Sequence, residues 1–197
     1  VVVAGQGVAS YLEKNSYKYV PYHQLFTRLE KTTVLDYGEF EIYPNRDSLS
    51  YRKTYGLEDI PTIKRGTMRR PGYCEAYNVF VQLGITDDTY IYHGDENTTY
   101  RTFINSFLDY DPEKPVEEKI CDLMHIEKDS AIMKKLEWLE IFSDKKIGMT
   151  DSTPAQILQK ILVDKWVLEP QDKDMIAMQH QFEYELNGKK KGITSSF

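Results

Sequence analysis

The C-terminal stretch constrains the fold more than any other part of the chain. Residues 174–186 alternate between apolar side chains and polar glutamine or glutamate side chains. Asn187 and Gly188 follow, and this pair favours a two-residue type I′ turn because both residue types tolerate a positive φ. Residues 189–197 can then return as the partner strand. The sequence therefore predicts a long β-hairpin, with His180 on its apolar face as a hydrogen-bonded core residue.

Two helices are predicted from clear start or stop signals. Residues 73–83 carry apolar side chains at three- to four-residue spacing, and Gly84 provides a C-terminal stop. Thr153 followed by Pro154 is a strong helix start, because threonine is a good N-cap and proline fits the first helical position. We expect this second helix to continue to about residue 167.

The intervening residues, about 86–150, are predicted to be a helical insertion. Their loops are rich in aspartate, and helices are expected over residues 99–108, 116–124 and 130–142. We expect these helices to be laid over the sheet. The predicted fold class is α+β (α/β-like), with a mixed β-sheet, helices on one face, a helical subdomain and the terminal hairpin, all within residues 1–197.

Composition excludes several classes of protein. The 197 residues have a formal net charge of −6, which argues against a nucleic-acid partner despite 15 tyrosines. No apolar run approaches the roughly 18 residues that a membrane span needs. Cys74 and Cys121 lack a CxxC spacing, which favours reduced thiols and a cytoplasmic location. The four histidines have no metal-ligand spacing, so no metal site is expected.

The N-terminal stretch resembles part of a dinucleotide-binding motif. An apolar run precedes Gly5 and Gly7, but Ser10 occupies the third glycine position and no βαβ unit follows within about 30 residues. We therefore reject a nucleotide site here. Both ends of the chain resemble strands that have been cut open, so we expect the chain to be a fragment.

Two short basic stretches are the strongest candidates for a ligand site. They are YPNRDS at residues 43–48 and RGTMRRPG at residues 65–72. Each follows a predicted strand, residues 39–43 and residues 62–64 respectively. Polar residues at the ends of strands are aimed by a rigid sheet, which is where binding groups are commonly found.

The contrast between the acidic chain as a whole and the cationic residues between Arg46 and Arg70 also favours a site for an anionic ligand in this region. If the two strands pair, Arg46 and Arg69 can meet, and two guanidinium groups suit a ligand with more than one carboxylate. The alternative is that these are ordinary solvated arginines, because most charged side chains are exposed.

No catalytic residue is predicted, since the thiol of Cys74 lies beside Glu75 and is not activated by it. The cationic residues of the region are Arg46, Arg52, Lys53, Lys64, Arg65, Arg69 and Arg70.

The two basic stretches resemble saccharopine dehydrogenase, the NADP-dependent, glutamate-forming enzyme family. The resemblance continues at residues 138–144, 173–180 and 194–196, so it spans most of the chain in order. It implies the substrate-binding second domain of such an enzyme, with NADP bound by an N-terminal Rossmann domain that is absent from this chain. The implied activity is the reversible formation of saccharopine from glutamate and α-aminoadipate semialdehyde, in lysine metabolism.

The resemblance also implies site residues and partners. Arg46, Thr67, Met68 and Arg69 match positions that contact substrate in the family, with Met68 in place of a leucine. Arg70 stands where a tyrosine is common, which is expected to alter the rim of the site. The expected ligand is saccharopine or a similar multi-carboxylate amino acid, and the expected assembly is a homodimer formed through this domain. The alternatives are a carboxynorspermidine-type dehydrogenase domain and a non-catalytic ligand-binding or dimerisation module.

Overall fold

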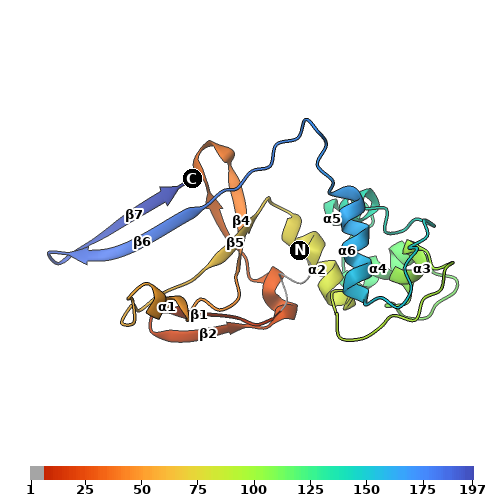
Figure 1. Ribbon diagram of the computed structural model, residues 1–197, viewed down its shortest axis with the longest axis horizontal. Helices are drawn as coiled ribbons and strands as arrows, with labels where there is room; N and C mark the ends of the chain where they lie inside the picture. The colour runs from red at the N-terminus through yellow and green to blue at the C-terminus, as the bar shows by residue number, and fades with distance from the viewer. Residues whose placement is uncertain (1–6) are drawn as a thin grey trace.

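The computed structural model describes residues 7–197. Its strands lie on one side of the molecule together with the short helix at residues 51–54, and most of the other helices lie on the other side (Figure 1). The α+β class and the terminal hairpin are confirmed. In place of one mixed sheet, the strands form three small antiparallel sheets. These are β1 (Ala9–Glu13) with β2 (Ser16–Val20), then β3 (Glu30–Thr33), β4 (Glu39–Pro44) and β5 (Gly66–Arg69) in that order, and β6 (Gln179–Leu186) with β7 (Lys189–Ser196).

The five predicted helices are present, although two are clearly shorter, and the short helix at residues 51–54 was not predicted. The helix expected over 99–108 ends at Asn105, and the helix expected over 130–142 ends at Trp138. The α-helices are α1 (Tyr51–Thr54), α2 (Tyr73–Leu83), α3 (Tyr100–Asn105), α4 (Val116–Met124), α5 (Ala131–Trp138) and α6 (Pro154–Lys165). Two short 3₁₀ helices, η2 (Tyr22–Thr27) and η3 (Leu35–Tyr37), precede β3 and β4.

Helix α2 joins the two sides of the molecule. Its side chains Tyr77, Val79 and Phe80 belong to the buried core, which continues through α3, α5 and α6. In Figure 1, α3 to α6 lie beyond α2 as seen from β4 and β5. The helical residues therefore stand beside the central sheet rather than over it as expected, because α2 already occupies the position between them.

Helix α6 begins with the predicted cap. The Thr153 hydroxyl accepts a hydrogen bond from the Gln156 N–H (3.3 Å), and the Gln156 side chain accepts one from the Thr153 N–H (2.8 Å). Pro154 occupies the first helical position, where its missing N–H costs nothing. This reciprocal pairing satisfies two backbone donors that the helix itself leaves unpaired.

Asp164 ties the C-terminal half of α6 to its neighbours. Its carboxylate accepts hydrogen bonds from the Lys145 ammonium and the Tyr100 hydroxyl, both at 2.8 Å. These bonds lower the pKa of Asp164 to about 2. A carboxyl group whose pKa is lower in the folded state stabilises the fold above its unfolded pKa, and that contribution is lost as pH falls through the folded pKa.

We expect Asp164→Asn to flatten the pH dependence of the unfolding free energy between about pH 4 and pH 2. Urea denaturation at several pH values measures this slope. Asp109→Asn, which removes an exposed carboxylate outside this network, should leave the slope as in the wild type. Equal slopes for the Asp164 and Asp109 variants would contradict the assignment.

The terminal hairpin has the predicted turn but not the predicted burial. Asn187 (φ 54°) and Gly188 (φ 71°) have the positive angles of a type I′ turn. The hairpin projects from the molecule, and its apolar face is open: Phe182 is 55% exposed. The expectation that His180 is a core residue is wrong, because its ring is exposed and makes only edge contacts with Phe182 and Phe197.

The base of the hairpin is anchored to the central sheet through Gln179. Its side-chain oxygen accepts a hydrogen bond from the Thr32 hydroxyl (2.8 Å), and its side-chain nitrogen donates to the Thr33 carbonyl (3.1 Å). No helix within residues 7–197 is both long and apolar enough to cross a membrane. The expected opening strand and Gly5 lie outside the described residues.

Candidate anion-binding site

The second basic stretch is itself a strand. The predicted strand at 62–64 is misplaced, because Ile63 exchanges backbone hydrogen bonds with Leu12 (2.9 and 3.1 Å) instead of pairing with β4. Strand β5 begins at Gly66, where a Cβ atom would overlap the side chain of Ile42 on the neighbouring strand. Glycine is therefore required for β5 to approach β4, and Arg69 lies within the sheet.

The register of β4 and β5 defines what surrounds Arg69. Arg69 lies opposite Glu41, and Thr67 lies opposite Tyr43. Side chains alternate between faces along a strand, so these four share one face of the sheet. Burial raises the pKa of the Tyr43 hydroxyl, and the charge of Arg69 opposes this shift. The side chain of Met68 points to the other face.

The guanidinium group of Arg69 is half-buried between two aromatic rings. It lies 5.3 Å from the centre of the Tyr73 ring and 6.0 Å from that of Tyr43, and it donates to the Met68 carbonyl (3.0 Å). Burial raises the pKa of the Tyr73 hydroxyl to about 12, against the opposing effect of the Arg69 charge. Within residues 7–197, no carboxylate forms an ion pair with Arg69.

Glu41 would be the natural ion-pair partner, but its carboxylate is used elsewhere. Its side chain is 6% exposed and accepts hydrogen bonds from the N–H groups of Gly72 (2.8 Å) and Cys74 (3.4 Å) at the start of α2. The cross-strand pair with Arg69 therefore does not form. Arg69 keeps guanidinium donors that suit a carboxylate of a ligand.

Arg70 follows Arg69 but lies on the opposite face of the sheet. Its guanidinium group stacks over the Phe40 ring at 4.5 Å and donates to the Tyr37 carbonyl. The expectation that Arg70 alters the rim of the site therefore does not hold for the face that carries Arg69. Arg70 instead holds the β3–β4 connection.

Arg46 stands at the far end of the same strand pair. Strand β4 ends at Pro44, and the register places position 46 beyond its end, five residues from the pair formed by Glu41 and Arg69. At about 3.4 Å per residue, the strand from Glu41 to Pro44 already spans about 10 Å, and Arg46 lies beyond it. Arg69 therefore lies within the sheet and Arg46 lies in the loop beyond β4, so pairing of the two strands does not by itself bring the two arginines together.

The loop around Arg46 is strained and tightly held. Arg46 has φ 43°, a left-handed angle that non-glycine residues rarely adopt, and its carbonyl accepts a hydrogen bond from the Ser10 N–H (2.8 Å). The Asp47 carboxylate accepts from the Leu49 N–H (2.7 Å), and the Ser48 hydroxyl accepts from the Arg65 N–H (3.0 Å). Strain that is held by its surroundings is characteristic of functional loops.

Several other cationic residues of the basic region have structural roles. Arg52 donates to the Glu58 carbonyl, Arg65 stacks over the Tyr51 ring at 3.9 Å, and Lys64 pairs with Glu30. These three side chains are therefore engaged with other parts of the chain. What remains as the candidate site is the Arg69 face and the Arg46 loop.

Within residues 7–197 the structure contains no reactive centre at this face. Burial, together with the nearby Glu41 carboxylate, raises the pKa of the Cys74 thiol to about 12, so its thiolate form is disfavoured. No group of three or more His, Cys, Asp or Glu side chains among the described residues is placed to hold a metal ion. The arrangement can bind and orient an anionic ligand.

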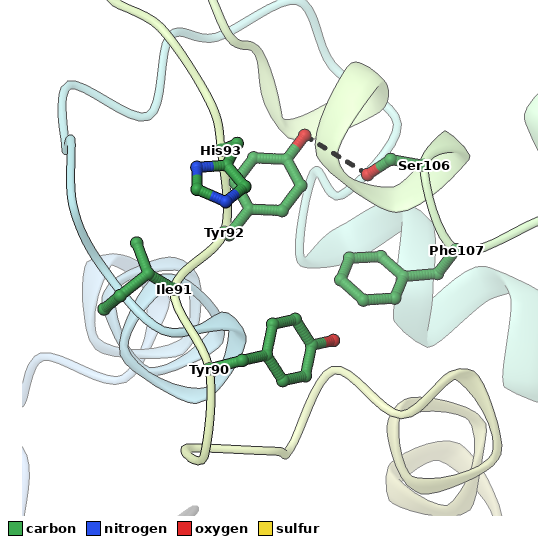
Figure 2. Close-up of a pocket in the computed structure, with 6 residues that line it drawn as sticks. All are labelled: Tyr90, Ile91, Tyr92, His93, Ser106 and Phe107. Atoms are coloured by element: carbon green, nitrogen blue, oxygen red, sulfur yellow. Dashed lines mark hydrogen bonds between the residues drawn. The ribbon is translucent and has the colours of Figure 1, made fainter.

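The structure also contains a hollow that the sequence did not predict (Figure 2). It has a volume of about 490 Å³ and lies between the 90–93 segment and α3. The Tyr92 hydroxyl and the Ser106 hydroxyl are hydrogen-bonded across it (3.2 Å). In the sequence, the aromatic residues of the 90–93 segment were the only indication of this hollow. Its lining holds no arginine or lysine, so it does not suit a carboxylate-rich ligand; the lining residues are Tyr90, Ile91, Tyr92, His93, Ser106 and Phe107.

Together, the strands and helices define an α+β domain whose central sheet presents the half-buried guanidinium group of Arg69. The chain belongs to the saccharopine dehydrogenase C-terminal domain family, whose model matches residues 1–197. It is 31% identical over 161 residues to mitochondrial alpha-aminoadipic semialdehyde synthase of Mus musculus, covering 78% of this chain and 17% of that protein. It is 27% identical over 202 residues to the saccharopine dehydrogenase [NADP(+), L-glutamate-forming] of Pyricularia oryzae, covering 100% of this chain and 45% of that protein.

A solved structure has the same fold. The apo, histidine-tagged saccharopine dehydrogenase (L-Glu forming) of Saccharomyces cerevisiae matches with a TM-score of 0.80 and 22% identity, covering 100% of this chain and 45% of that chain. The chain thus spans less than half the length of each of these relatives. The activity of a whole protein of this family therefore stands as a proposal for this chain.

Proposed function

We propose that this chain is the substrate-binding domain of an NADP-dependent saccharopine dehydrogenase. In this proposal the parent protein forms saccharopine reversibly from glutamate and α-aminoadipate semialdehyde. The observation that carries it is Arg69, a half-buried guanidinium group that lacks a carboxylate partner within residues 7–197. Its cross-strand neighbour Glu41 is held by α2, so the arginine is available to a ligand.

The spacing of the arginines supports an elongated ligand. Saccharopine carries three carboxylates and a secondary amine along an extended chain. Arg69 binds a carboxylate at one end, beside the Thr67 hydroxyl and the Met68 backbone, and Arg46 binds at the other end. Anchoring both ends fixes the position of the central amine, which lowers the entropy cost of reaction.

Residues 7–197 do not fit a dinucleotide cofactor. Strands β1 and β2 form an antiparallel hairpin directly after Gly7, whereas dinucleotide motifs require a parallel βαβ unit. In the proposal NADP is bound by a Rossmann domain elsewhere in the parent protein. The residues described here contribute substrate binding and orientation only.

Calorimetric titration of the full-length protein with saccharopine tests the proposal. We expect saturable binding with a dissociation constant in the micromolar to millimolar range typical of metabolic enzymes. Carboxynorspermidine, which has fewer carboxylates and more amines, is the comparator and should bind more weakly. Absence of saccharopine binding, or tighter binding of the comparator, would refute the proposed substrate.

We also propose that the protein is a homodimer whose two copies meet through the terminal hairpins. A lone two-stranded hairpin is at best marginally stable in water, so its open apolar face requires a cover. Phe182 pairs across the strands with Ile193, and both are more than half exposed. If the same face of a second copy packs against this face with two-fold symmetry, the side chains of Phe182 and Ile193 are both buried.

Phe182→Lys is expected to convert such a dimer into monomers, because it places a charge at the centre of the buried face. Light scattering coupled to size-exclusion chromatography measures the mass. Thr194→Lys, which introduces the same side chain on the polar face of the hairpin, should leave the dimer intact. A wild-type monomer, or equal effects of both substitutions, would contradict this assembly.

A cytoplasmic location is also a proposal. The free thiols of Cys74 and Cys121 support a reducing compartment. Because one relative is named as mitochondrial, organelle fractionation is the measurement that separates the two compartments.

A further inference from the structure

We infer that Glu41 is a positioning residue for Arg69 and acts through the first turn of α2. This inference rests on the proposed function, because it assigns Arg69 to the substrate. Glu41 itself does not touch the substrate. The cap that Glu41 forms on α2 fixes the wall of the site and also keeps the Glu41 carboxylate from forming an ion pair that would occupy Arg69.

Helix α2 has an unusual N-terminal cap. The N-cap residue is Gly72, which has no side chain to cap the helix. The cap comes instead from Glu41 of β4. One of its carboxylate oxygens accepts a hydrogen bond from the Gly72 N–H (2.8 Å), and the other accepts one from the Cys74 N–H (3.4 Å). A carboxylate is favoured there because helix N-termini carry partial positive charge. The charge of the buried Glu41 is thereby satisfied.

The turn between β5 and α2 is held from both sides. Glu41 accepts a hydrogen bond from the N–H of Gly72, and the Lys135 ammonium of α5 donates one to the carbonyl of Gly72 (2.7 Å). Gly72 has φ 79°, and a Cβ atom there would overlap the Lys135 side chain. The turn therefore has little freedom to move.

This turn also lies next to the guanidinium group of Arg69. Arg69 is the last residue of β5 and Tyr73 the first residue of α2, and the Tyr73 ring lies 5.3 Å from the Arg69 guanidinium. Anything that moves the start of α2 moves one wall of the site. A Glu41 side chain released from the helix would lie opposite Arg69, where oppositely charged cross-strand neighbours attract each other.

The alternative is that Glu41 only stabilises α2. A purely structural cap changes stability but has no effect that depends on Arg69. A positioning residue changes substrate binding through Arg69, so its effect disappears when Arg69 is removed. A double-mutant cycle separates the two roles.

The experiment uses Glu41→Gln in the full-length protein, since glutamine keeps the shape and one acceptor but loses the charge. We expect KM for saccharopine to rise about 10-fold, kcat to change less, and NADPH affinity to stay constant, because the lost group orients a charged hydrogen bond. In an Arg69→Met background the same substitution should change KM by less than about twofold. Glu75→Gln is the matched control: it removes an exposed carboxylate from the same helical turn and should leave KM unchanged.

Equal KM changes for the Glu41 and Glu75 variants, or an undiminished effect in the Arg69→Met background, would overturn the inference. If Glu41→Gln does not fold, Lys135→Met loosens the same turn from the other side and should raise KM in the same direction; an unchanged KM there would also overturn it. If the wild type does not bind saccharopine, the proposed function fails. NMR then still tests the positioning, because Glu41→Gln should shift the side-chain Nε–H signal of Arg69 and Glu75→Gln should not.

Discussion

Replacing Arg69 by methionine is expected to weaken saccharopine binding to the full-length protein by about 100-fold. Methionine keeps the apolar stem between the rings of Tyr43 and Tyr73 but removes the guanidinium group. The lost interaction is a charge-assisted, bidentate hydrogen bond in a half-buried site, worth about 3 kcal/mol. Each 1.4 kcal/mol corresponds to a factor of about ten in affinity. Calorimetry gives the dissociation constant, and steady-state kinetics give KM.

The chain offers a matched control in the next residue. Arg70→Met makes the same chemical change one position away, but Arg70 lies on the opposite face of the sheet over Phe40. It should change saccharopine affinity by less than about threefold, although it removes the hydrogen bond to the Tyr37 carbonyl and thereby lowers stability. Equal losses of affinity in the two variants would indicate a diffuse charge effect and would reject Arg69 as a specific anchor.

The parts of the fold that sequence could predict are those set by local signals. Asn187 and Gly188 specify their turn through their own backbone preferences. Thr153 and Pro154 likewise specify the start of α6, because the cap involves residues only three positions apart. The hairpin of β1 and β2 was missed, because its turn uses Lys14 at φ 48° and Asn15 at φ 60° without any glycine.

The geometry of the candidate site depended on contacts that sequence does not reveal. Whether Arg69 meets Arg46 depends on where β5 begins, and that is decided by Gly66 fitting against Ile42 and by Ile63 pairing with Leu12. Each of these contacts joins residues more than 20 positions apart. A strand predicted four residues too early therefore led to a wrong expectation about which side chains are neighbours.

The role of Glu41 was hidden for the same reason. Glu39 and Glu41 occupy equivalent alternating positions in β4, and nothing in the sequence separates them. In the structure Glu39 pairs with Lys31 at the surface, whereas Glu41 is buried against α2. A tertiary cap joins two elements that are far apart in sequence, so only the packing of α2 identifies it.

Replacing Arg46 by glycine is expected to separate stability from binding. Because φ at position 46 is 43°, glycine adopts this backbone with less strain than a residue that carries a Cβ atom. Arg46→Gly should therefore be more stable than Arg46→Ala by about 1 kcal/mol, measured by urea denaturation. Both variants lack the guanidinium group and should bind saccharopine about 10-fold more weakly than the wild type. Unchanged affinity in both would remove Arg46 as the second anchor, whereas equal stability of the two would show that the loop is not strained at this residue.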